Sequence, residues 1–204
     1  MEALEDPSAA VRAFETEVRA CRACADDFAA TVTAHAPRPV ARASSTARVL
    51  VCGQAPGARV HASGVFFDDR SGDRLRDWMG VSREVFYDRE RVAILPMAAC
   101  FPGYDAKGSD LPPPKRCAAL WRDRALALMP QAELTLLIGG YAQAWHLGGK
   151  AGVTERVRRW REAWPQALCL PHPSWRNTGW LKKHPWFEAE VLPALRARVA
   201  ELTA

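Results

Sequence analysis

The strongest constraint on the fold comes from four short apolar runs, each of which ends at a turn signal. They are residues 48–52 (RVLVC), 92–97 (VAILPM), 133–138 (ELTLLI) and 167–170 (ALCL). Hydrophobic side chains continue through these runs instead of alternating with polar ones, which is typical of strands buried on both faces in a parallel sheet. We therefore predict four buried strands.

Helical patterns separate the strands. They cover residues 8–23, 72–79, 114–129, 140–147, 154–163 and 185–202, whereas residues 31–46 are rich in proline and alanine and read as a connector. This order predicts an α/β fold: a three-layer α/β/α sandwich around a four-stranded, mainly parallel sheet. A length of 204 residues fits one domain, with residues 1–47 as an N-terminal helix and connector and 48–204 as the sheet core with its C-terminal helix.

Charge and hydropathy narrow the class of protein. The acidic N-terminus has neither the basic region nor the apolar region of a signal peptide, and no run approaches the ~20 apolar residues of a membrane helix. We expect a cytoplasmic protein, monomeric and without a membrane partner. The formal net charge is +5, with nine basic against five acidic side chains in residues 155–204. A basic C-terminal part favours a polyanion such as nucleic acid as partner.

Ligands of open α/β sheets bind at the carboxyl ends of the strands, so the residues that follow each run are candidates for chemistry. They are 53–57 (GQAPG), 98–103 (AACFPG), 139–140 (GG) and 171–174 (PHPS). The glycines of GQAPG let backbone amides approach a ligand, although glycine-rich turns end many strands. His172 lies between two prolines that restrict its direction, but a purely structural loop histidine is the alternative interpretation.

The six cysteines fall into two groups. Cys52 and Cys169 lie within apolar runs and read as small core residues, which leaves a C-x2-C pair and a pair with sixteen residues between them: Cys21, Cys24, Cys100 and Cys117. A redox C-x-x-C should follow a strand and open a helix, whereas this one closes a predicted helix. Four thiolates in two distant pairs suit a [4Fe–4S] cluster or a structural zinc ion, and free thiols remain a third possibility.

Taken together and in chain order, GQAPG, GVFFDDRSGDRL (64–75), AAC, IGG and HPS resemble the motifs of the uracil-DNA glycosylase superfamily, especially its family 4 and family 5 branches. The resemblance covers nearly the whole chain. It implies a DNA repair enzyme that flips uracil out of DNA and hydrolyses its N-glycosidic bond to leave an abasic site. It also implies a structural [4Fe–4S] cluster on Cys21, Cys24, Cys100 and Cys117.

Two positions depart from the family 4 pattern. Family 4 has a glutamate at the second position of the first motif, where this chain has Gln54. Family 5 instead uses an aspartate in a stretch similar to residues 66–75, which aligns with Asp69. Family 4 has an asparagine that pairs with the uracil edge, and this chain has Met97 at that position, next to Pro96. The resemblance therefore does not say how the protein distinguishes uracil from cytosine. The resemblance thus implies Asp69 and His172 as the catalytic pair.

The resemblance further implies a base pocket and a surface that contacts DNA. The pocket residues are Gly53, Gln54, Ala55, Phe66, Phe67 and Ser174. Phe67 aligns with the ring that stacks on the base, with Phe66 as its alternative, and core packing is the other interpretation of the pair. The DNA-contacting residues are Trp175, Arg176, Asn177, Lys182 and Lys183. Trp175 and Arg176 are candidates for a side chain that fills the space left in the DNA helix by the flipped base.

The missing carboxylate at Gln54 leaves a second hypothesis from another functional class. On this hypothesis the protein holds uracil or abasic sites in DNA with little or no turnover. The presence or absence of cleavage separates the two.

Overall fold

The computed structural model describes residues 7–204, and at its centre lies a sheet of four strands that are all parallel. In spatial order the strands are β2 (Val92–Ile94), β1 (Val49–Cys52), β3 (Leu134–Ile138) and β4 (Ala167–Leu170). All four predicted strands are confirmed. β2 is shorter than predicted because Pro96 has no N–H to donate to a ladder, so regular pairing ends ahead of it.

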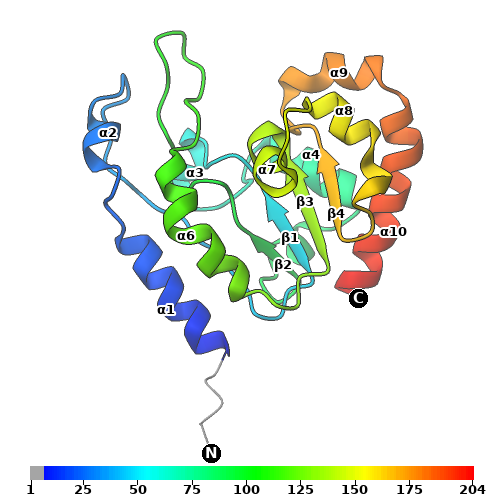
Figure 1. Cartoon of the computed structure of the whole chain (residues 1–204), viewed down its shortest axis with the longest axis horizontal. Coiled ribbons are helices and arrows are strands. Elements are labelled where there is room, and N and C mark those ends of the chain that lie inside the picture. The colour runs from blue at the N-terminus through cyan, green and yellow to red at the C-terminus, as the bar shows by residue number, and fades with distance from the viewer. Residues whose placement is uncertain (1–6) are drawn as a thin grey trace, which may run out of the picture.

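Helices cover both faces of the sheet, as the predicted three-layer sandwich requires (Figure 1). One layer contains α6 (Lys115–Ala127), α7 (Gly139–Leu147) and α8 (Val153–Arg158), and the other contains α4 (Arg70–Met79) and α10 (Leu192–Thr203). Every residue of β1 and β2 is buried, which explains why these runs lack polar alternation. The predicted layered α/β fold is therefore confirmed.

The helix boundaries differ from the prediction in several places. The first helix, α1 (Pro7–Ala20), ends before Cys21, and the predicted helix 154–163 divides into α8 and a 3-10 turn (Trp160–Glu162). A π-helical turn (Phe187–Val191) leads into α10. Helices of five or six residues were missed because they are too short to show a period: α2 (Ala25–Ala29), α3 (Ala58–Ser63), α5 (Arg83–Tyr87) and α9 (Thr178–Lys183).

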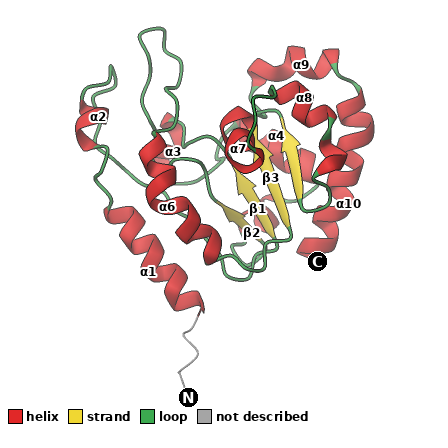
Figure 2. Cartoon of the chain, viewed as in Figure 1, coloured by secondary structure: helices red, strands yellow, loops and turns green. Residues whose placement is uncertain are grey.

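Long loops gather beyond the carboxyl ends of the strands. Figure 2 shows one of them, between β2 and α6, rising past the edge of the sheet. Residues 31–46 form the predicted irregular connector, which pairs with β2 through an isolated bridge between Arg42 and Ile94. Residues 1–6, part of the segment for which we predict no signal peptide, lie outside the described residues. Within residues 7–204 no helix has the length and apolarity needed to cross a bilayer.

A buried arginine joins α6 to the ends of two strands. The guanidinium of Arg122 is 2% exposed and donates to the carbonyl oxygens of Leu95 and Pro96, at 3.2 Å each, and to Sγ of Cys52 at 3.1 Å. It pairs with no carboxylate among the described residues, and instead its charge lies over the ring of Trp145. Carbonyl dipoles and an aromatic face therefore solvate this cation inside the protein.

The charge of Arg122 acts on His146, a hydrogen-bonding neighbour on α7. Burial and the adjacent guanidinium lower the pKa of His146 to about 4. A histidine whose pKa falls on folding stabilises the protein fully above its unfolded pKa of ~6.5, and this contribution is lost as the pH drops toward the folded value. We therefore expect the urea midpoint of unfolding to fall between about pH 6.5 and pH 4.

The variant His146→Gln tests this assignment. Its profile should be shallower than that of the wild type, although not flat, because burial also lowers the pKa of His61 and His172. Equal slopes for variant and wild type over this pH range would show that His146 is not the group responsible.

Candidate active site

The turn after β1 is fastened to the chain that leaves β2. The carbonyl oxygen of Gly53 accepts the N–H of Met97 at 2.9 Å, and that of Gln54 accepts the N–H of Ala98 at 3.2 Å. The side-chain amide of Gln54 donates to the carbonyl of Leu111 at 3.4 Å, in the long loop before α6. Pairing thus continues past the two strands and holds the GQAPG turn over the carboxyl edge of the sheet.

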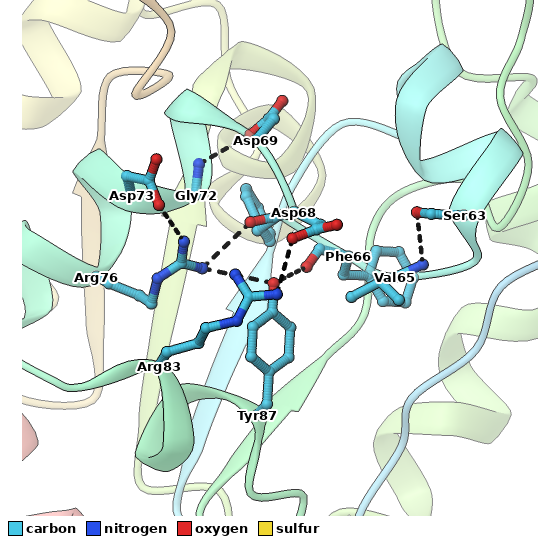
Figure 3. Close-up of polar contacts among 11 residues, drawn as sticks. Ser63, Val65, Phe66, Asp68, Asp69, Gly72, Asp73, Arg76, Arg83 and Tyr87 are labelled. Atoms are coloured by element: carbon cyan, nitrogen blue, oxygen red, sulfur yellow. Dashed lines mark hydrogen bonds and ion pairs between the residues drawn. The ribbon is translucent and has the colours of Figure 1, made fainter.

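Phe66 and Phe67 point to different places. Phe66 is buried in the core, and its carbonyl accepts the hydroxyl of Tyr87 at 2.7 Å, as Figure 3 shows. The backbone of Phe67 has a φ of 54°, a left-handed conformation that is rare outside glycine. Its ring lies against the GQAPG turn, with Cζ 3.8 Å from where a Cβ on Gly53 would stand. Phe66 is therefore a core residue, and Phe67 is the one whose ring lies at the GQAPG turn.

Two adjacent aspartates differ in their partners (Figure 3). Asp68 forms an ion pair with Arg83 at 2.8 Å, and the guanidinium lowers the pKa of this carboxyl. Asp69 caps α4, accepting the N–H of Gly72 at 2.9 Å through Oδ1, and its Oδ2 makes no hydrogen bond with a described residue. The two carboxylates therefore differ in charge environment: Asp68 is paired with a guanidinium, whereas Asp69 has no ion-pair partner among the described residues and keeps Oδ2 available for a substrate or a water molecule.

His172 is held as a neutral ring of defined tautomer. Its Nδ1 accepts the backbone N–H of Ser174 at 3.2 Å, so the ring proton resides on Nε2. Asn177 donates to the carbonyl of His172 at 2.7 Å and fixes the backbone of the loop. Burial lowers the pKa of His172, and the charges of Asp69 and Asp110 oppose this effect. The imidazole therefore carries one hydrogen-bond donor, Nε2–H.

Arg74 connects the Asp69 segment to the His172 loop. From α4, which Asp69 caps, its Nη1 donates to the carbonyl of Ser174 at 2.9 Å and its Nη2 to the hydroxyl of Thr178 at 3.3 Å. The two candidate catalytic groups are thus positioned relative to each other by one side chain. Neither Arg74 nor Asp110 was predicted as a site residue: Arg74 lies in the stretch 64–75 but its contacts are with the distant His172 loop, and Asp110 lies in no motif.

A pocket of about 490 Å³ opens beside His172 at the carboxyl ends of β1, β3 and β4. Its walls come from four loops and helices and include Gln54, Gly139, Gly140, Tyr141, Thr154, Pro171, His172, Asn177 and Trp180. Asp69 and Phe67 are not among the wall residues, although Asp69 is close enough to act on the pKa of His172. Three of the four predicted strand ends therefore meet at one cavity.

The family model for the uracil DNA glycosylase superfamily matches residues 39–196, most of the chain. The chain belongs to the uracil-DNA glycosylase superfamily. The match contains the GQAPG turn, Asp69, the pocket and the HPS loop, and it covers Cys100 and Cys117 but not Cys21 and Cys24.

The residues predicted to contact DNA follow His172 in the chain. Trp175 is 73% exposed, with the guanidinium of Arg176 over its ring, and Lys182 and Lys183 close the short helix α9. Asn177 differs from these residues, since its amide is engaged within the His172 loop and lines the pocket. The prediction that all five contact DNA stays a prediction, and for Asn177 the structure adds a role in shaping the loop.

Four cysteines lie around one narrow hollow of about 20 Å³ on the far side of α6 from α7. The thiols are those of Cys21, Cys24, Cys100 and Cys117, whereas Cys52 and Cys169 are buried in the strands. Burial raises the pKa of Cys24 and Cys117 and raises that of Cys100 to about 12. Within residues 7–204, no three His, Cys, Asp or Glu side chains are gathered closely enough to bind a single metal ion. The four thiols line one hollow, and Cys100 and Cys117 lie near enough to Cys21 and Cys24 for the thiols to act on one another's pKa values.

The contact between Gly72 and Phe67 generates a test of the site's packing. A Cβ on Gly72 would stand 1.7 Å from the carbonyl oxygen of Phe67, which Arg76 also holds. We expect Gly72→Ala to lower the free energy of unfolding by at least ~1–3 kcal/mol, because the backbone must move to admit the methyl group. Urea denaturation measures this loss.

The matched control is Gly179→Ala in α9, where an added Cβ meets no atom within 4 Å. Alanine is the better helix former, so this variant should be unchanged or more stable by up to ~1 kcal/mol. Equal stability of the two variants would contradict the close packing of Phe67 on Gly72.

Proposed function

We propose that the protein is a uracil-DNA glycosylase that takes uracil out of DNA and hydrolyses its N-glycosidic bond, leaving an abasic site. One observation carries the proposal: a neutral His172 with its proton on Nε2 stands beside the pocket, close enough to Asp69 to feel its charge. A neutral donor and a carboxylate match the two charges that develop when this bond breaks.

The reaction separates charge between base and sugar. The bond between C1′ of deoxyribose and N1 of uracil breaks, and its electron pair leaves with the base, where it spreads onto O2. Nε2–H of His172 donates a hydrogen bond to that oxygen, and Asp69 stabilises the cationic sugar. A water molecule adds to C1′ while Asp69 accepts its proton. Asp69 then releases this proton to solvent and the uracil anion takes one up, so that the products are uracil and an abasic site.

The pocket also offers groups that distinguish uracil. The ring of Phe67 lies against the GQAPG turn, and a pyrimidine can stack on it. Backbone amides of the same turn can donate to the oxygens of the base. Gln54, a pocket residue held by one long hydrogen bond, can turn its amide to accept from N3 of uracil and donate to O4. Cytosine presents the opposite pattern at these two positions. We assign to Gln54 the role that an asparagine has in family 4.

The runner-up is a protein that binds uracil or abasic DNA without turnover. The unengaged Oδ2 of Asp69 favours turnover, because a carboxylate kept only as a helix cap needs one oxygen. An end-labelled oligonucleotide containing one uracil decides between them when it is incubated with protein and then treated with alkali. Cleavage at the uracil supports the glycosylase, whereas a shifted but uncut oligonucleotide supports the binding protein.

The two neighbouring aspartates provide a matched pair of variants. Asn is as good a helix cap as Asp, so Asp69→Asn should fold normally yet lose about 10²–10⁴ in single-turnover excision rate. DNA affinity should change little, because it depends mainly on phosphate contacts. Asp68→Asn removes the ion pair with Arg83 at the surface and should keep most of the activity. Inactivity of Asp68→Asn with an active Asp69→Asn would place the catalytic carboxylate one residue earlier.

We further propose that the four clustered cysteines hold a [4Fe–4S] cluster, as in the family 4 and family 5 branches. The support is that four thiols line one hollow and lie near enough to act on one another's pKa values, and four thiolates are the number of ligands that such a cluster takes. Such a group would cross-link the turn between α1 and α2, the β2–α6 loop and α6. It lies on the opposite side of α6 from His172, so this chain's residues perform the hydrolysis without it.

The cluster proposal predicts a brown protein with broad visible absorption and about four iron and four sulfide per chain. Cys100→Ala should remove the colour and lower the thermal unfolding midpoint, whereas Cys169→Ala, at a buried cysteine outside the hollow, should keep the colour. A colourless protein with stoichiometric zinc, or one without metal that is equally stable, would exclude the cluster.

A further inference from the structure

Helix α7 presents to solvent a face without charge. Its sequence, GGYAQAWHL, contains no Lys, Arg, Asp or Glu, whereas α1, α4, α6 and α10 each carry three or more of these residues. Tyr141 and Trp145 are 47% and 41% exposed, with Ala144 between them also exposed. Residues four apart share one side of a helix, so the two rings lie on a common surface. A surface of this kind indicates a binding function.

This surface continues into the pocket of the candidate active site. Tyr141 and Ala144 are wall residues of the pocket that contains His172 and Gln54, and Trp145 lies one turn farther along α7. A strand whose flipped base occupies the pocket would therefore meet Tyr141 first and Trp145 next. The position of the rings connects them with the substrate and not with a remote partner.

Trp145 is rigidly supported from beneath. The guanidinium of Arg122 lies 4.6 Å from the centre of its ring, and the ring of His146 stands edge-on at 4.7 Å. Arg122 is itself fixed by the carbonyls of Leu95 and Pro96. Rigid support reduces the conformational entropy lost when a ligand stacks on the exposed part of the ring.

We propose that Tyr141 and Trp145 form a stacking platform for unpaired bases that flank the flipped uracil, so that the preferred substrate is single-stranded DNA. This inference rests on the proposed function. The rings are about 6 Å apart along the helix axis, from the rise of 1.5 Å per residue, which allows successive bases of an extended strand to stack on them. Bases of a duplex hide their faces, and α7 offers no cation to duplex phosphates.

Binding of uracil-free oligonucleotides tests the platform without any need for turnover. Fluorescence anisotropy compares a labelled single strand with the duplex of the same sequence. Because stacking of one base on one ring contributes ~1–3 kcal/mol, Tyr141→Ala and Trp145→Ala should each weaken single-strand binding by about 5-fold to 100-fold. Duplex binding should change by less than about twofold. Trp145→Phe, which keeps a ring, should retain most of the affinity.

Leu147→Ala is the matched control, since Leu147 is exposed to a similar degree on the same helix but lies away from the Tyr141 side. It should bind both DNAs as the wild type does. Equal losses on single strand and duplex, or no loss in either alanine variant, would overturn the platform, and the latter result would point to a protein as the occupant of this face. Circular dichroism melts confirm that the variants are folded.

Failure of the platform and failure of the proposed function give different results. A wild-type protein that never excises uracil, but whose single-strand affinity depends on the two rings, refutes the glycosylase and retains the platform. The opposite result is a wild type that excises uracil equally from single strand and duplex, with alanine variants that bind like the wild type. That result retains the glycosylase and refutes the platform.

Discussion

Parallel hydrogen bonding among four buried strands determines where the loops and helices of the site lie. It brings the carboxyl ends of β1, β3 and β4 to one cavity and places the GQAPG turn, the start of α7 and the His172 loop around it. The pairing of Gly53 with Met97 extends the sheet into the loops, and Arg74 fixes α4 to the His172 loop. The site is therefore as rigid as the sheet beneath it, which suits a reaction that depends on preorganised groups.

The sequence predicted the sheet well because its signals are local. Runs such as residues 48–52 are long and apolar enough to indicate buried strands, and the residues after them mark the edge where ligands bind. The roles of neighbouring aspartates could not be predicted in this way. Asp68 and Asp69 differ through Arg83 and the N–H of Gly72, and only the fold brings Arg83 to the first of them. The roles of Arg74 and Asp110 were not predicted for the same reason, since they arise from contacts between segments that are distant in the chain.

Burial and charge act in opposite directions at His172, and their balance sets the chemistry available. Burial keeps the ring neutral, while Asp69 and Asp110 make protonation easier than it would otherwise be. A neutral donor stabilises an oxygen on which negative charge is growing without requiring a proton from solvent, and the two carboxylates stay compatible with a cationic sugar. The buried side chains of Arg122 and Arg76 hold the frame by donating to the carbonyls of Leu95 and Phe67, and they lie outside this exchange.

In the proposed reaction, His172 stabilises the negative charge that develops on the departing base. Single-turnover excision of uracil and of 5-fluorouracil by the wild type and by His172→Ala tests it directly. Removing one preorganised donor should slow uracil excision by about 10²–10³. The loss should be smaller for 5-fluorouracil, because that base carries negative charge more easily. Equal losses on the two bases would contradict the claim and would leave His172 as a residue that positions the base or the loop.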